Sequence, residues 1–594
     1  MLGDVLARLL RKLGFNVNTR FYVNDLGRQV ATLIYGTQIV ESANIRKPES
    51  IKIDHWYGVI YAIVNTLLEL EKLRKKLDAK IEEALKLSQN LVDILVTKSE
   101  KSEDLVEILI ATKEFIEKAR FVHNPYLLLK KLYIVLRLHS KKLLEDLDLT
   151  TVLKQLLDDI DEYRRTWNEY KKFLIAEKML STTYSKLYNC LRSAIRNYEE
   201  AENAIKNIMR RSENGDEEVL LVIRRVTQDV LEGFKETLNK LNIAFNGFDF
   251  ESSKEIVALA KSIVKDVLRT KYARILEGGA IEVDLNSASQ DHNYIRDLFY
   301  PDQAGRFVLQ RSDGTTLYIT RDIAYTLYKF KMLGASEVYN VIAVEQEREQ
   351  KQVKATLYIL GFKHEAENLH HFMYEMVHLK GMRMSGRRGI YYTLDELLVD
   401  MENCIIKKLL GERCTHRLDY DTVSKLAVAN VRALLLTVEP GKVLSLDPAK
   451  LCENEHGIIV EYAYVRTQGI LRNALNIEPL RDPQELNSKI RTLFEDLFKS
   501  NEKPSLSVEE RLLVELLADF TTTLLDSYRE LKPNRILEYT VKLALQFNKF
   551  YEKHPVIAER DERVKAWRLI LVYATFKVLT ELLDILGLPK LQRI

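Results

Sequence analysis

The stretch TTLYITRDIAYTLYKFKMLGASEVYNVIAV, residues 315–344, decides the expected fold of this chain. It contains a short β-rich run, then a segment whose apolar residues have helical spacing, and then a second β-rich run. Further β-rich runs lie on both sides of it, and they are AIEVDL (280–285), RFVLQ (306–310) and YEMVHL (374–379). Strands that alternate with helices predict a mostly parallel sheet with helices packed on it.

The segment that precedes this region has a different texture. Between Gly58 and Gly215 the chain has no glycine and only one proline, Pro125, and its apolar residues recur with helical spacing. Long antiparallel helices that form an arm are therefore expected. The charged positions are interpreted as the solvated faces of these helices, and binding along the arm is the alternative.

After residue 400 the strand pattern ends, and successive segments have the amphipathic period of helices, which predicts a helical bundle. The expected fold class is thus α/β plus all-α. FNVNTRFYVND (15–25) also alternates like a strand, so that the α/β part begins near the amino terminus. The predicted parts are an α/β segment at 1–57, a helical insertion at 58–272, the rest of the α/β part at 273–400 and the bundle at 401–594.

Composition restricts the chain to a few classes of protein. Its 594 residues suffice for three or four domains, and 89 Lys and Arg against 86 Asp and Glu leave a net charge of only +3. Any nucleic-acid contact must therefore come from local basic clusters. Four scattered cysteines argue against a disulfide framework and favour a reducing cytosol. No apolar run reaches the roughly 18 residues of a membrane span, so a cytoplasmic protein with no membrane contact is expected.

The first helix has a clear end and an unusual start. An apolar stripe from Leu2 to Leu13 follows helical spacing, and Gly14 ends it. No Ser, Thr, Asp or Asn precedes the stripe, although such residues normally cap the free N–H groups there. Further residues are therefore expected upstream of Met1.

The loop GMRMSGRRG, residues 381–389, combines three arginines with three glycines. Glycine allows the backbone to approach a ligand closely, and arginine can neutralise phosphate oxygens. The TLDE segment that follows, Thr393–Glu396, has the spacing of a capping box, which predicts a helix start beside the loop. A solvated basic turn remains the alternative interpretation of the loop.

Polar residues follow two successive predicted strands. Thr315–Ile319 is predicted as a strand, with Thr320 as the cap of the next helix and Asp322 in its first turn. Tyr318 and Asp322 then lie at a strand end, where open α/β sheets bind ligands. Glu345 and Gln346 end the next strand, so the two ends together predict a pocket for a small cationic molecule. Stabilisation of the helix by Asp322 alone is the competing explanation.

Five segments together resemble the arginyl-tRNA synthetase family, which is part of class I of the aminoacyl-tRNA synthetases. They occur in the family's order over nearly the whole chain: YVNDLGRQ (22–29), DGTTLYITRDIAYTLYKF (313–330), NVIAVEQ (340–346), MRMSGRRG (382–389) and IIVEYAYVRTQGILRNA (458–474). The resemblance implies a Rossmann-like catalytic domain in two parts, a helical insertion of archaeal type and a helical anticodon-binding domain.

The resemblance also implies an activity and its site residues. The carboxylate of arginine would attack the α-phosphate of ATP, which arrives with Mg²⁺, and the arginyl group would pass to tRNA(Arg). Tyr318, Asp322 and Gln346 match residues that bind arginine, and Asp25 and Gln29 match a loop near the active site. The catalytic loop that faces the pyrophosphate is matched by Arg383, Ser385, Arg387 and Arg388. Arg383 and Gly386 stand where the family usually has lysines, which puts the contribution of the loop to the rate in doubt.

Aromatic and cationic residues in the predicted bundle are candidates for contact with tRNA bases, with core packing as the alternative for the aromatic residues. They are Tyr462, Arg466, Arg472, Asn548 and Tyr551. No resident metal is expected, because the spacings of Cys404, Cys414, His416, Cys452 and His456 fit no paired zinc-ligand pattern.

One element of the family pattern is missing. None of the eleven histidines forms the His-x-Gly-His signature, which in the family precedes the Gly-Asp found here as Gly3-Asp4. The family's N-terminal domain is absent as well. Two hypotheses follow: a truncated or incomplete enzyme, monomeric or completed by a separately encoded N-terminal piece, and a tRNA-binding remnant that forms no adenylate.

Overall fold

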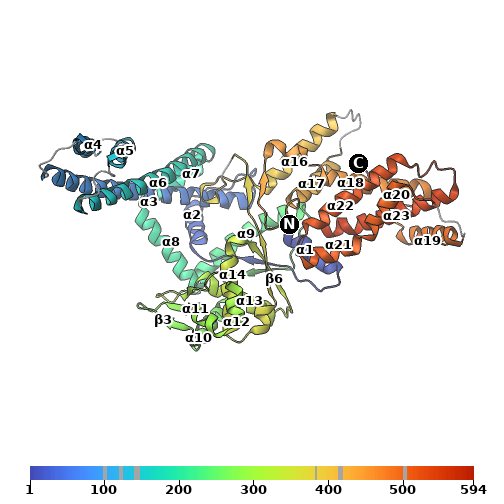
Figure 1. Ribbon diagram of the computed structural model, residues 1–594, viewed down its shortest axis with the longest axis horizontal. Helices are drawn as coiled ribbons and strands as arrows, with labels where there is room; N and C mark the ends of the chain where they lie inside the picture. Colours follow the sequence, from blue (N-terminus) through green and yellow to red (C-terminus); the bar gives the residue numbers. More distant parts are fainter. Residues whose placement is uncertain (98–102, 120–124, 140–146, 382–383, 412–418, 500–504) are drawn as a thin grey trace.

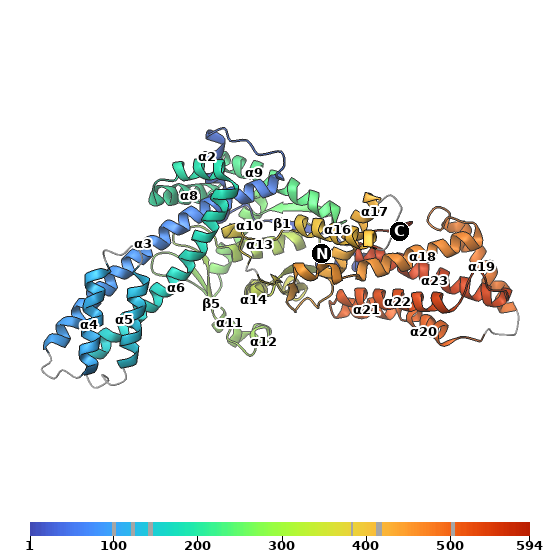
Figure 2. The same cartoon turned by 90° about the horizontal axis from the view of Figure 1, so that it is seen from above.

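The computed structural model describes residues 1–97, 103–119, 125–139, 147–381, 384–411, 419–499 and 505–594. The molecule is elongated and has three parts (Figure 1). A helical arm lies at one end, the strands and the helices α10–α14 lie in the middle, and a helical bundle lies at the other end. The view from above shows the same order (Figure 2).

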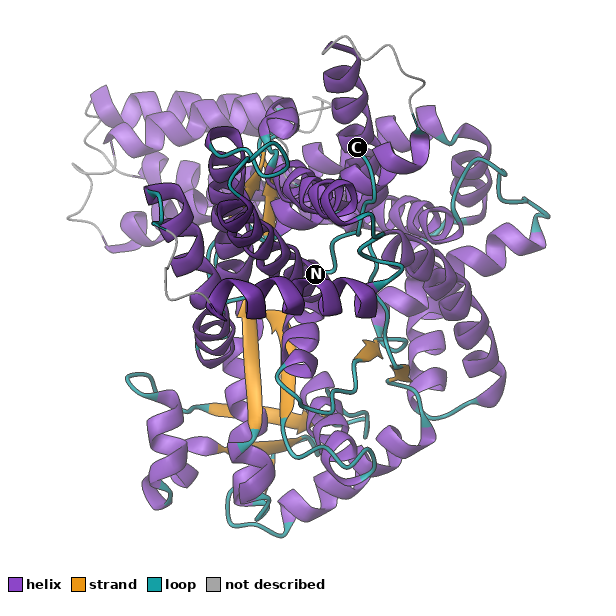
Figure 3. Cartoon of the chain, turned by 90° about the vertical axis from the view of Figure 1, so that its right-hand side faces the viewer, coloured by secondary structure: helices purple, strands orange, loops and turns teal. Residues whose placement is uncertain are grey.

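The middle part is built on short parallel strand pairs. β1 (Arg20–Val23) pairs with β2 (Gly247–Phe250), and β6 (Val338–Ala343) pairs with β7 (Leu369–Tyr374), both in parallel. A third parallel pair joins β8 (Val377–Leu379) to β9 (Leu444–Leu446). These strands lie among helices in the side view (Figure 3). The strands and the helices around them agree with the predicted α/β class. The expectation of one mostly parallel sheet is corrected, because the strands of the described residues form separate small sheets, and the predicted strands at 280–285 and 306–310 pair antiparallel.

An antiparallel sheet of β3, β4 and β5 and several short helices complete the middle part. The remaining elements of the first 57 residues and of the middle part are α1 (Leu2–Lys12), α2 (Arg28–Ser42), α10 (Lys254–Leu268), β3 (Ala273–Ile275), β4 (Ile281–Asp284), α11 (Leu285–Asp291), α12 (Asn293–Phe299), β5 (Arg306–Gln310), α13 (Tyr318–Lys331), η2 (Val344–Gln346), α14 (Glu347–Ile359), α15 (Lys363–Glu367) and η3 (Gly386–Arg388).

β2 lies inside the range that was predicted to be a helical insertion, 58–272. Its partner is β1, with Val23 opposite Phe250, so that this strand belongs to the middle part of the molecule. α10, which follows it, packs its apolar face on α13 in the same core through Ile256, Ile263 and Val267. The helical insertion therefore ends before Gly247. A four-residue strand that contains a glycine is too short to give a periodic signal.

The predicted strand Thr315–Ile319 is wrong, because α13 begins at Tyr318 and Leu317 is its N-cap residue. Thr320 does not cap the helix: its hydroxyl donates a hydrogen bond of 2.7 Å to the carbonyl of Leu309. Asp322 consequently lies in the second turn of the helix. Ile319 and Ile323 are buried in the core shared with α10, and this packing outweighs the strand propensity of the β-branched residues.

The predicted helical arm is confirmed. α3 and α6 run side by side along most of its length, and α4 and α5 lie at its tip (Figures 1 and 2). Apolar residues such as Leu91, Leu132 and Leu156 are fully buried between these helices. The helices of the arm and its base are α3 (Ile53–Thr97), α4 (Glu103–Lys118), α5 (Tyr126–His139), α6 (Leu147–Thr183), α7 (Ser185–Ala194), α8 (Tyr198–Glu213) and α9 (Glu217–Lys240).

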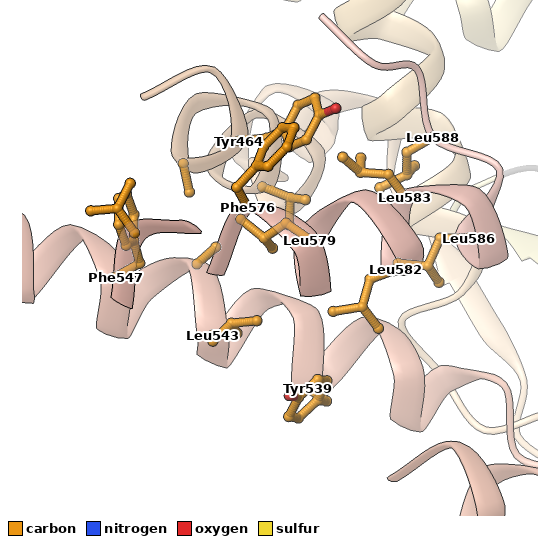
Figure 4. Close-up of a cluster of buried hydrophobic side chains, with 14 of the residues drawn as sticks. Tyr464, Tyr539, Leu543, Phe547, Phe576, Leu579, Leu582, Leu583, Leu586 and Leu588 are labelled. Atoms are coloured by element: carbon orange, nitrogen blue, oxygen red, sulfur yellow. The ribbon is translucent and has the colours of Figure 1, made fainter. Parts of the chain in front are cut away.

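The C-terminal part is the predicted helical bundle. Its core contains the stacked rings of Tyr464 and Phe576, whose centroids are 5.7 Å apart, together with Leu543 and Phe547 (Figure 4). Its elements are α16 (Leu394–Gly411), α17 (Tyr420–Leu435), η4 (Pro448–Glu453), α18 (His456–Leu475), α19 (Pro483–Lys499), α20 (Val508–Ala518), α21 (Phe520–Arg529), α22 (Asn534–Lys553) and α23 (Glu562–Leu586). Within the described ranges, no helix is long and apolar enough to cross a lipid bilayer.

Two cysteines form a disulfide, contrary to the expectation that none of them would pair. Cys404 of α16 is bonded to Cys452 of η4, with a Cα–Cα distance of 5.2 Å. The two residues are 48 positions apart, and the packing of α16 on η4 brings them together. Sequence spacing alone does not reveal such a pairing. Cys414 and His416, the other candidates near them, lie outside the described residues.

Candidate active site

Tyr318 and Asp322 lie one turn apart on α13, so their side chains share one face of the helix. Tyr318 is 55% exposed, whereas Asp322 is only partly accessible. Burial raises the pKa of Asp322 to about 7, and the nearby carboxylate of Glu349 adds to the shift. Burial likewise raises the pKa of Tyr318 to about 12, again with a contribution from Glu349. The two predicted residues thus face a second carboxylate.

Glu349 comes from the first turn of α14 and is 8% exposed. Burial raises its pKa to about 6, and the neighbouring hydroxyl of Tyr318 opposes this shift. Its Oε1 atom is buried without a hydrogen-bond partner. A buried oxygen of this kind is costly unless another group satisfies it. Asp322, Glu349 and Tyr318 together form an acidic cluster, which is named the acidic pocket because of the ligand site proposed for it.

Other titratable groups surround the acidic pocket. The hydroxyl of Tyr22 is buried without a partner, and burial with the charges of Glu251 and Asp322 raises the pKa of that hydroxyl well above its usual range. Lys329 lies near Asp322 and donates a hydrogen bond of 2.6 Å to Asn340. Burial lowers the pKa of Lys329 to about 8, and the carboxylate of Asp322 opposes this shift.

The remaining charges nearby are paired within the protein. Arg321 donates to the carboxylate of Glu251 at 2.5 Å, and both side chains are buried. Asp249 accepts hydrogen bonds from Arg20 at 2.9 Å and from Tyr325 at 2.8 Å. Asp322 and Glu349 are therefore the carboxylates that remain to receive a ligand. A small cation with several N–H donors has the chemistry to fit there.

The other residues predicted near this pocket have different surroundings. Gln346 ends η2 directly before α14, and its side chain is exposed. Asp25 is fully buried after β1, where it accepts hydrogen bonds from the amide of Ser252 at 2.8 Å and from its hydroxyl at 2.5 Å. Burial raises the pKa of Asp25. Asp25 thus links the ends of β1 and β2, while Gln29 is exposed on α2.

The described residues of the basic loop are docked on the base of the arm. Asn65 of α3 donates a hydrogen bond of 3.0 Å to the backbone carbonyl of Arg387. Gly389 adopts a left-handed conformation with φ of 64°, and a Cβ atom there would lie 3.1 Å from Ala62 and 3.2 Å from Leu180. The loop therefore needs glycine at this close approach to α3 and α6.

Ser385, Arg387 and Arg388 lie in or beside the single turn η3. The side chain of Arg387 is exposed, and that of Arg388 is partly exposed. Arg383, the other predicted loop residue, lies outside the described residues. The predicted capping box after the loop is confirmed: Thr393 accepts from the Glu396 amide at 3.0 Å, and Glu396 accepts from the Thr393 amide at 2.6 Å.

Comparisons with known proteins bear on the whole chain. Residues 166–429 match the model of the catalytic domain of class I tRNA synthetases (R), and residues 460–594 match that of the DALR anticodon binding domain. The chain is 32% identical over 598 residues to the arginine–tRNA ligase of Saccharolobus solfataricus and 33% identical over 598 residues to that of Sulfurisphaera tokodaii. Each of these alignments covers 100% of this chain and 79% of the relative.

The chain belongs to the arginine–tRNA ligase family. Its fold agrees with the solved arginyl-tRNA synthetase of Thermus thermophilus, with a TM-score of 0.59 at 19% identity over 100% of this chain and 78% of the other. The arginyl-tRNA synthetase of Plasmodium falciparum gives a TM-score of 0.52 at 18% identity, over 68% of this chain and 63% of the other.

All five residues that were predicted to contact tRNA lie within 460–594, the range that matches the DALR anticodon binding domain. The structure brings four of them together. The guanidinium of Arg466 lies 4.3 Å from the ring centroid of Tyr462 and 4.5 Å from that of Tyr551. It also approaches Asn548, at 3.5 Å. Both tyrosines are exposed, so that they form a surface cluster rather than core. Arg472 is not part of this cluster, because it pairs with Glu478 at 2.7 Å.

Sequence reasoning missed Glu349 of the acidic pocket, and also Tyr22 and Lys329 beside it. Glu349 follows Gln346 by three residues, and nothing in the sequence distinguishes it from Glu347 in the same helical turn. A repeated acidic first turn has an ordinary explanation in the helix dipole. Only packing shows that one of the two side chains turns inward. Within the described ranges, no three His, Cys, Asp or Glu side chains form a metal-binding group.

Proposed function

We propose that this chain binds arginine in the acidic pocket, activates it with ATP and transfers it to tRNA(Arg). Membership of the arginine–tRNA ligase family supports the proposal. The observation that carries it is the pair Tyr318 and Asp322 on α13 beside the carboxylate of Glu349, whose Oε1 atom is buried without a hydrogen-bond partner. A guanidinium can form two parallel hydrogen bonds with a carboxylate, which explains a preference for arginine over lysine.

The reaction needs no protein nucleophile. The arginine carboxylate attacks the α-phosphate of ATP, and pyrophosphate leaves. The ribose hydroxyl at the end of tRNA then attacks the carbonyl carbon of the arginyl-adenylate, an ester forms, and AMP leaves. We assign the pyrophosphate side to Arg383, Ser385, Arg387 and Arg388, and Mg²⁺ arrives bound to ATP as part of the substrate. Positioning of the substrates and neutralisation of the phosphate charge then accelerate the reaction.

The three parts of the molecule receive separate tasks in this proposal. The middle part, together with residues 1–57, performs catalysis in the cytoplasm. The exposed cluster of Tyr462, Arg466, Asn548 and Tyr551 stacks on unpaired anticodon bases. Asp25, Gln29 and Gln346 are proposed to lie at the edge of the arginine site.

The test is arginine-dependent exchange of ATP and pyrophosphate by the purified chain, with tRNA(Arg) present. Exchange that requires arginine and fails with lysine is the expected result. Calorimetric titration of arginine and filter binding of tRNA(Arg) accompany it. If the chain binds tRNA(Arg) but neither binds arginine nor catalyses the exchange, it is a tRNA-binding subunit, and the proposed enzymatic function is wrong.

A further inference from the structure

We propose that Glu349 is a second ligand of the substrate guanidinium, so that Asp322 and Glu349 hold it from two sides with the Tyr318 hydroxyl beside them. The inference rests on the proposed arginine-activating function and adds a specificity-determining residue to it. No segment of the family resemblance contains Glu349, because NVIAVEQ ends at Gln346.

The first observation is the contrast between two glutamates of one helical turn. Glu347 points outward and pairs with Lys351 at 2.8 Å, as a first-turn glutamate on a helix surface commonly does. Glu349 is 8% exposed and has one buried oxygen without a partner. Stabilisation of the helix dipole does not require this burial, because a solvated carboxylate serves equally well. The burial of Glu349 therefore needs an explanation other than stabilisation of the helix.

The second observation is that cations of the protein near Glu349 and Asp322 are already engaged. Arg321 is bound to Glu251 at 2.5 Å, and Lys329 donates to Asn340 at 2.6 Å. The neighbouring charged and titratable groups are thus Tyr318, Arg321 and Lys329 of α13 together with Tyr22 of β1 and Glu251 after β2. These groups leave two partly buried carboxylates with an excess of negative charge, and a ligand cation removes that excess.

The third observation is the rigid attachment of Glu349. Asn340 of β6 donates a hydrogen bond of 2.8 Å to Gln350, the next residue, and Gln350 is 4% exposed. This bond fixes the start of α14 against the strand that ends beside the pocket. A ligand group held on a fixed helix start loses little conformational entropy on binding.

The chemistry selects arginine over its closest analogues. A guanidinium has five N–H donors in a plane and can serve two carboxylates at different edges, whereas the ammonium of lysine is a compact point charge. Citrulline has the shape of arginine without its charge. Two carboxylates therefore discriminate against citrulline more strongly than one carboxylate does.

The test is titration calorimetry of the full chain with arginine and with citrulline at pH 8. The variants are Glu349→Gln, which keeps the size of the side chain and removes its charge, Glu349→Asp, and the control Glu347→Gln in the same turn. We expect Glu349→Gln to weaken arginine binding by about 10- to 100-fold, the loss of one charge-assisted contact. Glu349→Gln should also narrow the preference for arginine over citrulline, and Glu347→Gln should change neither.

A proton measurement separates ligation from a purely structural role. The pKa values of about 7 and about 6 for Asp322 and Glu349 mean that the free pocket holds part of a proton on each group at pH 6.5. Arginine favours the ionised forms and therefore releases protons, which calorimetry in buffers of different ionisation enthalpy detects. We expect Glu349→Gln to release fewer protons than the unaltered chain.

Each outcome decides one question. If the unaltered chain binds arginine and Glu349→Gln binds it equally well with the same proton release, Glu349 is not a ligand, and the proposed function stands. If Glu349→Gln weakens binding but leaves proton release and the preference over citrulline unchanged, Glu349 only orients Tyr318, and the inference is wrong. If the unaltered chain binds no arginine, the proposed arginine pocket fails, and this inference fails with it.

Discussion

Asp322 shows how one side chain can be prepared for a ligand at a cost to the empty protein. It is partly accessible, yet its surroundings raise its pKa to about 7. In the empty pocket near neutral pH the carboxyl therefore carries a proton for about half of the time. A guanidinium that binds there supplies a positive charge beside the Asp322 carboxylate. The favourable energy of this ion pair is therefore gained only when the ligand binds.

At this scale the first prediction concerns Asp322→Ala. The substitution removes a bidentate partner of the guanidinium, so arginine affinity should fall by about 100-fold or more. Affinity for tRNA(Arg) should not change, because α13 is remote from α18 and α22 of the bundle, which carry the proposed tRNA contacts (Figure 1). Calorimetry with arginine and filter binding with tRNA measure the two effects. Asp297→Ala, at a side chain that is 73% exposed, is the control, and undiminished arginine binding by Asp322→Ala would remove Asp322 from the pocket.

Glu461 of α18 is a second carboxyl with a shifted pKa, and its effect is on stability. It is fully buried, its Oε1 atom has no partner, and burial raises its pKa to about 8. An unfolded glutamate has a pKa of about 4.3. The folded protein thus holds a proton that the unfolded chain releases between these values. The contribution of this residue to stability is therefore greatest below pH 4.3 and decreases as the pH rises to about 8.

The second prediction follows from that sign. Glu461→Gln is neutral at every pH, so it should lose less stability between pH 5.5 and pH 8.5 than the unaltered chain does. The difference should exceed about 1.4 kcal/mol, the free energy of one pKa unit. Urea unfolding at the two pH values measures it. Glu495→Gln, at an exposed position of α19, is the control, and parallel pH profiles for Glu461→Gln and the unaltered chain would show that the carboxyl does not stay protonated on folding.

At the scale of elements, the docking of the basic loop on the arm couples two parts of the molecule that lie far apart in the sequence. The contact consists of the bond from Asn65 to the carbonyl of Arg387 and the close packing of Gly389 on Ala62 and Leu180. The base of the arm therefore holds the segment that the proposed mechanism places beside pyrophosphate. Asn65 is itself 9% exposed, so its amide has little water to replace the bond.

The third prediction tests this contact. Asn65→Ala removes the donor to Arg387, so residues 384–389 should leave α3 more often. Limited trypsin digestion should then cut after Arg387 and Arg388 several-fold faster, with the melting temperature nearly unchanged. Asn90→Ala, at an exposed position of the same helix α3, should digest like the unaltered chain. Equal cleavage rates for Asn65→Ala and the unaltered chain would show that α3 does not restrain the loop.

The fourth prediction concerns the exposed cluster on α18 and α22. Arg466→Ala removes the cation between Tyr462 and Tyr551, and it also removes a surface on which a base can stack. The free energy of tRNA(Arg) binding should therefore weaken by about 1–3 kcal/mol. Arginine binding should be unchanged. Arg529→Ala, on α21 of the same bundle and 71% exposed, removes the same charge elsewhere. If the two variants bind tRNA(Arg) equally, the cluster does not take part in tRNA binding.

These elements also show what the sequence could predict. The long helices of the arm and the bundle and most strands followed from periodicity, because their apolar faces repeat over many residues. The first residue of α13 and the strand β2 could not be predicted from periodicity, because tertiary packing decides both. Tyr318 and Asp322 were identified from their place after a predicted strand and from the family resemblance, whereas Glu349 differs from Glu347 only by the direction in which it points. The disulfide depends on two elements that are distant in the sequence.

At the scale of the whole molecule, one buried junction joins the bundle to the first helix. Arg432 of α17 is 0% exposed and donates to Asp4 of α1 at 2.5 Å and to the carbonyl of Leu586 at 2.8 Å. A third bond reaches the carbonyl of Leu241, which follows α9. Arg8 of α1 also binds Asp4, at 3.0 Å. One guanidinium thus ties together α1, the end of α9 and the end of α23.

The last prediction is that Arg432→Leu loosens this junction. It leaves the carboxylate of Asp4, which is 8% exposed, with only Arg8 as a partner, and it removes the donor from two buried carbonyls. The loss should be about 3–5 kcal/mol, typical of a broken buried ion pair. The bundle should then unfold in urea separately from the middle part, as two transitions by tryptophan fluorescence and circular dichroism.

A double variant identifies the cause of this loss. Asp4→Leu combined with Arg432→Leu removes both charges, so it should recover part of the stability that Arg432→Leu loses, because no unpaired carboxylate remains. Arg529→Leu, at the exposed position of α21, is the surface control. If Arg432→Leu unfolds at the same urea concentration as Arg529→Leu, the junction contributes nothing to the coupling, and apolar packing such as that of α1 on α23 connects the two parts.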